Sequence, residues 1–120
     1  MSVLYPLYVL LDDRRMTVIE SPDRILYHLE AIDIENDEYL FWDSTEKAVR
    51  ITIEKNKVAY VSYCDSSLAL RDAFLSYVDA VGLPRTLVEG KPADIFSGIK
   101  EELQSRWNEK SWFARLLDRL

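Results

Sequence analysis

The chain has 120 residues and a mass of 14.0 kDa, a size that fits one domain with its own core. Hydrophobic residues make up 48% and charged residues 30% of it, which is too apolar a composition for a disordered protein. The net charge of −6 argues against general nucleic-acid binding, because that activity needs Lys and Arg to neutralise phosphates.

The single cysteine, Cys64, excludes an intrachain disulfide and favours a reducing compartment. The first six residues contain no charged n-region and no small-residue cleavage site, so they do not resemble a signal peptide. The apolar run of residues 7–11 is too short to span a bilayer. We therefore expect a cytoplasmic protein without a membrane partner.

Two strand-like runs, residues 7–11 and 16–20, open the chain and are joined by a polar turn. Ser21 and Pro22 then predict a helix start, with Ser as the N-cap residue and Pro in the first turn. This helix is expected to end near Asp33. Its apolar stripe would consist of Ile25, Leu29 and Ile32.

Three further strands are predicted at residues 39–42, 49–54 and 58–64. The middle one alternates most clearly, with Val49, Ile51 and Ile53 on one face. Because short turns join the three, they should form an antiparallel meander with one buried and one wet face.

A second helix is expected after residues 65–67, which would provide its cap. Its end is well defined, because Gly82 suits a left-handed cap, Leu83 can fold back and Pro84 stops continuation. Its apolar residues have the spacing of a core-facing helix, and they are Leu70, Ala73, Phe74, Tyr77, Val78 and Val81.

Pro92 should begin a third helix, and Ser111 should cap a short fourth one. The element order β-β-α-β-β-β-α-α-α predicts an α+β fold with a mainly antiparallel five-stranded sheet and helices packed on one face. We expect residues 1–120 to form a single domain. Residues 92–120 would be a C-terminal helical segment packed on it.

The acidic segment 30–46 is the most unusual part of the sequence, because it holds seven carboxylates and no Lys or Arg. One interpretation is a solvated loop that tolerates its own repulsion. The other is a negative surface kept for a basic partner. The carboxylates are Glu30, Asp33, Glu35, Asp37, Glu38, Asp43 and Glu46.

Residues with catalytic or ligating chemistry are few. The only histidine, His28, lies at the edge of a helix stripe, where packing is the simpler role. Cys64 precedes a helix and could be a nucleophile, although strand parity favours a small buried hydrophobe. The three glycines are scattered, so no phosphate loop is predicted. Asp33, Glu35 and Asp37 alternate as in a calcium loop but lack its turn glycine.

These observations favour a small acidic, non-enzymatic protein-interaction domain without a cofactor or metal, comparable to an immunity or antitoxin-like inhibitor of a basic partner. Exposed carboxylates would steer the encounter and aromatic residues would anchor it. The predicted partner-binding residues are Asp33, Glu35, Asp37, Glu38, Tyr39 and Trp42.

Two alternatives remain open. The first is a small enzyme or ligand-binding protein with a helix–sheet pocket near His28 and Cys64, to which Tyr60 or Tyr63 would contribute. The second is a homo-oligomer assembled through the C-terminal helices, because aromatic anchors dominate interfaces. Its contact residues would be Trp107, Trp112 and Phe113.

Overall fold

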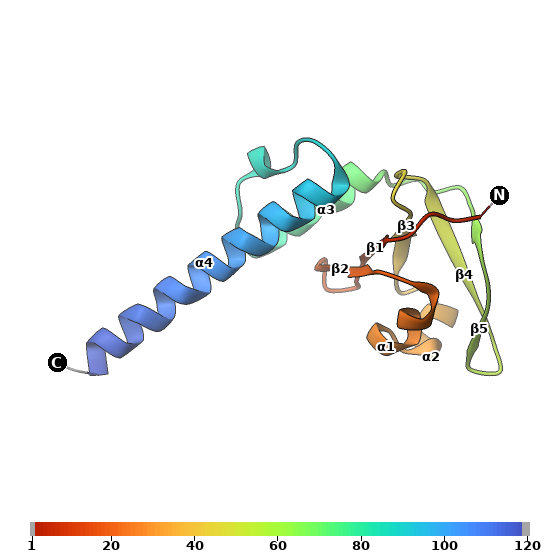
Figure 1. Cartoon of the computed structure of the whole chain (residues 1–120), viewed down its shortest axis with the longest axis horizontal. Coiled ribbons are helices and arrows are strands. Elements are labelled where there is room, and N and C mark those ends of the chain that lie inside the picture. The colour runs from red at the N-terminus through yellow and green to blue at the C-terminus, as the bar shows by residue number, and fades with distance from the viewer. Residues whose placement is uncertain (1, 119–120) are drawn as a thin grey trace.

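The computed structural model describes the backbone of residues 2–118 and the side chains of residues 2–109. All strands belong to one antiparallel sheet, whose strand order is β2-β1-β3-β4-β5 (Figure 1). The predicted α+β class and five-stranded antiparallel sheet are confirmed. The strands are β1 (Leu7–Leu10), β2 (Met16–Ile19), β3 (Leu40–Trp42), β4 (Ala48–Glu54) and β5 (Lys57–Tyr63).

The number of α-helices agrees with the prediction, but their boundaries differ. The predicted third and fourth helices are one continuous helix that passes Ser111 without a break. Residues 104–114 contain neither Gly nor Pro, so nothing in this stretch stops a helix. The helices are α1 (Ile25–His28), α2 (Ala31–Glu35), α3 (Leu70–Val81) and α4 (Pro92–Asp118), with short 3₁₀ turns at Pro22–Arg24 and Arg85–Leu87.

The predicted first helix is broken between α1 and α2, because Leu29 adopts an extended backbone conformation. The break changes which residues face the core: Ile34 is buried, whereas Ile32 is 60% exposed. The Ser21 hydroxyl does not cap the helix but donates a hydrogen bond to the carboxylate of Asp23. The predicted stripe therefore holds for Ile25 and Leu29 and fails at Ile32.

The predicted end of helix α3 is confirmed, whereas its predicted start is wrong. Ser66 does not cap it, because the Ser66 hydroxyl closes a turn with Leu68 and the helix begins later, at Leu70. At the other end, Gly82 has the predicted left-handed conformation (φ 73°). The Leu83 N–H donates to the Val78 carbonyl at 2.8 Å, as expected for a chain that folds back after a glycine cap.

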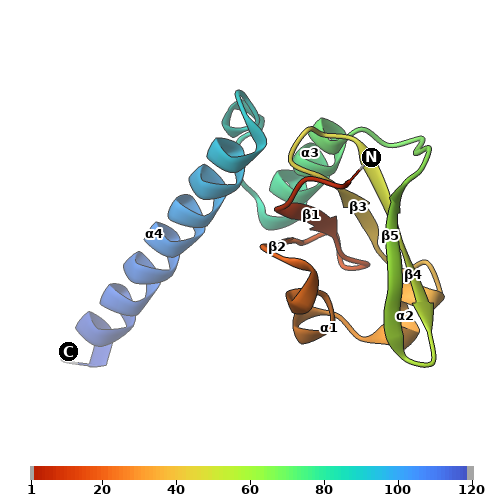
Figure 2. The same ribbon diagram turned by 45° about the vertical axis from the view of Figure 1, so that its right-hand side comes forward.

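The sheet carries a hydrophobic core on each face, so the expectation that the helices pack on one face is corrected. In β1, Leu7 and Val9 pack toward α1 and α2, while Tyr8 between them packs toward α3 and α4. All three are at most 2% exposed. Consecutive apolar residues of this kind mark a strand that is buried on both faces. Figure 2 shows β1 and β2 between α4 and the pair α1 and α2.

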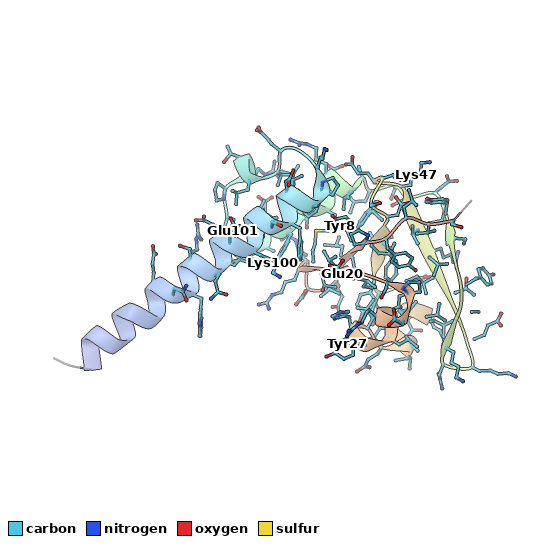
Figure 3. The ribbon with its side chains drawn as sticks, in the orientation of Figure 1. Tyr8, Glu20, Tyr27, Lys47, Lys100 and Glu101 are labelled. Atoms are coloured by element: carbon cyan, nitrogen blue, oxygen red, sulfur yellow. The ribbon has the colours of Figure 1, made fainter. Side chains whose placement is uncertain are left out.

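Among the described side chains, those of the first part of α4 form the core between that helix and the sheet. Ile95 and Ile99 are buried. The ring of Tyr8, a residue labelled in Figure 3, makes edge-to-face contacts with Phe74 and Phe96 at centroid distances of 5.8 and 6.4 Å. Arg106 of α4 still donates to the Gly82 carbonyl at 2.9 Å. The C-terminal part of α4 then extends away from the body of the molecule (Figure 1), which is 58 Å along its longest axis. The packing of the whole segment 92–120 on the domain stays a prediction, because the side chains of its last residues lie outside the described part of the chain.

A buried carboxylate, Asp43, connects three parts of the chain at the β3–β4 turn. Its side chain is 0% exposed. Burial alone would raise the pKa of Asp43, but the hydrogen bonds that its carboxylate accepts from Thr45, Tyr63 and the Leu4 amide hold it below the ordinary value. The donors are the Leu4, Thr45 and Lys47 backbone amides and the Thr45 and Tyr63 hydroxyls.

The first prediction concerns this carboxylate. Asp43→Asn should lower the free energy of unfolding by about 2–3 kcal/mol, because an amide nitrogen cannot accept the hydrogen bonds of a carboxylate oxygen. The depressed folded pKa means that its stabilisation is complete above pH 4 or so and is lost as pH falls through the folded pKa. Urea unfolding from neutral to acidic pH measures both effects. Glu89→Gln, at an exposed site, is the control and should change neither the free energy of unfolding nor its pH dependence. The same pH dependence in both variants would contradict the role of Asp43.

The second prediction concerns α4. A chain that ends at Gly90 should be destabilised by about 3–6 kcal/mol, since it loses two buried isoleucines at roughly 1.5–3 kcal/mol each. A chain that ends at Glu109 keeps Ile95 and Ile99 and should melt at the temperature of the full chain. Thermal unfolding followed by circular dichroism distinguishes the two. Equal melting temperatures for the Gly90 and full-length chains would show that α4 adds nothing to the core.

Candidate functional site

In the folded chain, the seven carboxylates of the acidic segment fall into three groups that differ in exposure. Asp43 is buried and serves the fold, and Asp33 is half-buried. The others are exposed on α2, in the loop to β3 and in the β3–β4 turn. These exposed carboxylates are Glu30, Glu35, Asp37, Glu38 and Glu46. Two predicted partner-binding carboxylates, Asp37 and Glu38, thus lie at the surface of one loop, with Glu35 just before it.

Asp33, Glu38 and Tyr39 lie together among the carboxylates of the acidic segment. The Tyr39 hydroxyl donates to Asp33 Oδ2 at 3.0 Å, and the Glu38 backbone amide donates to the Asp33 carbonyl at 3.1 Å. A hydrogen bond between the side chains of Glu38 and Asp33, and repulsion from the Asp33 carboxylate, raise the pKa of Glu38. Burial, the bond to Asp33 and the surrounding charges raise the pKa of Tyr39 to about 12. Neighbouring carboxylates contribute to both raised pKa values, so this part of the surface carries a concentrated negative charge.

The structure adds Asp12 to this field. Asp12 lies in the β1–β2 turn, and the pairing of β1 with β3 brings that turn close to the loop before β3. Its charge contributes to the raised pKa values of both Glu38 and Tyr39. Sequence reasoning missed Asp12 because nothing in the local pattern predicts that β1 and β3 are neighbours.

No positive charge neutralises the segment within the described residues. The ion pairs there are Arg15–Asp13, Arg85–Asp79 and Arg106–Glu102, all outside residues 30–46. Nor does the described part of the chain contain a group of three or more Asp, Glu, His or Cys residues that could hold a metal ion. The charge of Asp12, Asp33 and Glu38 is therefore left to solvent or to an external group.

The predicted aromatic anchors do not behave alike. Trp42 is 1% exposed, and its indole N–H donates to the Leu68 carbonyl at 3.1 Å. It is a core residue that holds the segment before α3, so its assignment as a surface anchor is wrong. Tyr39 is half-buried with its hydroxyl engaged by Asp33. The exposed apolar residues next to the carboxylates are instead Ile32, 60% exposed, and Leu40, 41% exposed.

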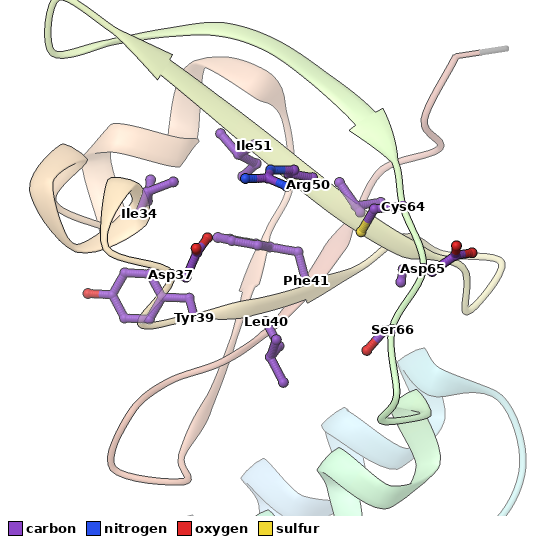
Figure 4. Close-up of a pocket in the computed structure, with 12 residues that line it drawn as sticks. Ile34, Asp37, Tyr39, Leu40, Phe41, Arg50, Ile51, Cys64, Asp65 and Ser66 are labelled. Atoms are coloured by element: carbon purple, nitrogen blue, oxygen red, sulfur yellow. The ribbon is translucent and has the colours of Figure 1, made fainter.

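Cys64 lines a pocket of about 200 Å³ between β3, β4 and the end of β5 (Figure 4). Arg50, Asp37 and Tyr39 also line it, but His28 does not. The pocket is smaller than the roughly 300–1,000 Å³ of typical ligand sites. Tyr63 and Cys64 share a second hollow of about 300 Å³ beside the β3–β4 turn, again without His28. Neither hollow brings together the histidine and cysteine that the enzyme hypothesis paired.

The expectation that Cys64 is buried is wrong, because its side chain is exposed. Helix α3 contacts β1, and the α3-side face of β4 and β5 remains open, so that Arg50 and Tyr60 are exposed there too. Partial burial of the sulfur and the Asp65 carboxylate nevertheless raise the pKa of Cys64, while Arg50 acts in the opposite direction. A thiol with a raised pKa is a poor nucleophile at neutral pH.

The residues proposed for an oligomer contact lie on the projecting part of α4. Trp107 is 68% exposed and lines a groove of about 680 Å³ with Leu103, Arg106 and Val81. The side chains of Trp112 and Phe113 lie outside the described residues. Their part in a contact between copies stays a prediction.

Comparison with known proteins gives no match: no family model, no curated protein and no solved structure matches this chain. Among the described residues, no helix combines the length and the apolar character needed to cross a membrane. The functional interpretation therefore rests on the geometry of the acidic surface.

The third prediction tests the environment of Cys64. Its modification by a thiol reagent should be slow at neutral pH and should accelerate as pH rises, since burial and Asp65 favour the protonated thiol. Arg50→Gln should slow the reaction further at a given pH, because Arg50 lowers the thiol pKa. Arg24→Gln, which removes a charge from a residue that does not act on Cys64, is the control. Rapid labelling of the unaltered chain at pH 7 would instead favour the enzyme hypothesis.

Proposed function

We propose that this protein is a non-enzymatic interaction domain of the cytoplasm whose acidic surface binds a basic partner protein. The acidic surface consists of Asp12, Asp33, Glu35, Asp37 and Glu38. An immunity or antitoxin-like inhibitor, which covers a basic cleft of another protein, is the concrete form of this proposal.

The observation that carries the proposal is a pair of neighbouring carboxylates, Asp33 and Glu38, with which no Lys or Arg of the described residues forms an ion pair. Asp33 and Glu38 lie close enough for one to raise the pKa of the other. Asp12 adds charge from a separate turn. Holding like charges together costs stability, and a partner's Lys or Arg would remove that repulsion. Binding of an external cation would therefore relieve a repulsion that remains in the isolated domain.

Exposed apolar side chains beside the carboxylates support a protein partner over a simple ion. Ile32 and Leu40 stand next in sequence to Asp33 and Tyr39 and are largely exposed. Interfaces commonly combine charged groups that steer the encounter with apolar groups that slow dissociation. In this mechanism the acidic surface sets the association rate, and Ile32 and Leu40 set the residence time.

The fourth prediction follows from screening of exposed charges. Asp37→Lys with Glu38→Lys should slow association about tenfold or more at low salt and flatten its salt dependence, while the dissociation rate changes little. The partner is first captured from lysate of the native host at low and at high salt. Association and dissociation of the purified pair are then measured by surface plasmon resonance.

The matched control is Glu54→Lys with Glu89→Lys, which changes the net charge equally at exposed positions outside the acidic surface. It should leave the salt dependence nearly intact. Equal slowing by both double variants would show that net charge, and not this surface, controls binding. Unchanged binding by Asp37→Lys with Glu38→Lys, together with a loss of stability, would make the segment a structural ion-pair site and remove the main support for the proposal.

A further inference from the structure

Strand β5 forms the outer edge of the sheet (Figure 1). Its inner edge pairs with β4, and the Cys64 amide continues that ladder by donating to the Ala48 carbonyl at 3.1 Å. Because backbone groups alternate in direction along a strand, Ser62 also points its amide and carbonyl toward β4. Val61 and Tyr63 consequently point theirs outward.

The outward groups of Val61 and Tyr63 have no hydrogen-bond partner among the described residues. Unpaired edges of this kind are templates for another strand. On the same strand Tyr60 is 57% exposed, although it is a large aromatic residue. A β-bulge opposite Thr52 and Ile53 bends the start of β5, so regular pairing along the outer edge is confined to residues 60–64.

The charges along this edge indicate the direction in which a second strand would pair with it. Lys57 begins the strand, Lys55 lies in the turn before it and Asp65 follows its end, and all three are exposed. Two copies of one strand that pair across a twofold axis run antiparallel. The start of each then meets the end of the other, so opposite charges face each other. A parallel arrangement would place the lysines of both copies side by side.

We propose that β5 pairs antiparallel with β5 of a second copy of this chain, which joins the two sheets edge to edge. The symmetric register sets Val61 opposite the second copy's Val61, where both can exchange amide–carbonyl hydrogen bonds. Outside the regular stretch 60–64, the Lys57 end of one strand lies beside the Asp65 end of the other. The two Tyr60 rings become diagonal neighbours on one face, within reach of each other.

This assignment differs from a dimer built through α4. The β5 edge lies far from the projecting helix (Figure 1), and it uses backbone groups that α4 cannot provide. It also differs from the binding of an unrelated extended peptide, because only a second copy necessarily supplies the reversed order of charges.

A charge exchange tests the proposal. Sedimentation of the full chain over a range of concentrations should show a species of twice 14.0 kDa. Lys57→Glu and Asp65→Lys alone should each weaken the dimer about tenfold, since each brings like charges together at both ends of the paired strands. The double variant restores opposite charges and should regain most of the wild-type affinity. Circular dichroism of each variant checks that the monomer stays folded.

Hydrogen exchange locates the interface. The Val61 and Tyr63 amides should become protected as the concentration rises, while the Lys55 amide in the adjacent turn should not. Trp107→Ala is the control and should dimerise like the unaltered chain. A monomer at all concentrations overturns the proposal, even if an extended peptide then binds the edge. A dimer that leaves Val61 unprotected, or that is lost in Trp107→Ala, overturns the assignment to β5 in favour of α4.

Discussion

The fold depends on the buried carboxylate of Asp43, which lies where the hairpin of β4 and β5 joins the rest of the sheet. Strand β3 is short and pairs with β4 through only Phe41 and Trp42, so the hairpin of β4 and β5 is attached to the rest of the sheet by few ladder contacts. The Asp43 carboxylate adds hydrogen bonds to Leu4, to its own turn and to Tyr63. Because these donors replace water completely, the charge can stay buried.

The burial of Asp43 explains why the carboxylates of the acidic segment differ in their roles. Asp43 belongs to a run of carboxylates, yet its role is opposite to that of its neighbours. It is surrounded by donors that lower its pKa, whereas Glu38 is surrounded by carboxylates that raise its own. One carboxylate therefore stabilises the fold, and the others form a field whose repulsion the isolated domain does not relieve.

The two proposed contacts lie on different parts of the sheet. The acidic surface gathers around the β1–β2 turn and the loop before β3, whereas the self-pairing edge is β5. A dimer joined through β5 would thus present two acidic surfaces. The pairing of β1 with β3 accounts for this separation, because it places the hairpin of β1 and β2 at one end of the sheet and β5 at the other.

Much of the fold was predictable from local pattern. The alternation of residues 49–54 and the spacing of apolar residues in α3 identify their elements because burial of one face imposes a period of 2 or 3.6. Gly82 ends α3 as predicted, since its left-handed conformation is a local backbone requirement. Little of the candidate site was predictable in the same way. Trp42 and Asp43 have the local appearance of surface residues in an acidic, aromatic segment, but both are buried.

The fold class, the five strands and the excess of negative charge can all be read from the amino-acid sequence, because propensity, periodicity and composition are properties of short segments. Three features depend on tertiary contacts instead: β1 is covered on both faces, Asp12 joins Asp33 and Glu38, and His28 lines neither hollow next to Cys64. These facts depend on which strands become neighbours and on where helices begin. Strand order and packing are set by contacts between residues far apart in the chain, and no local pattern encodes them.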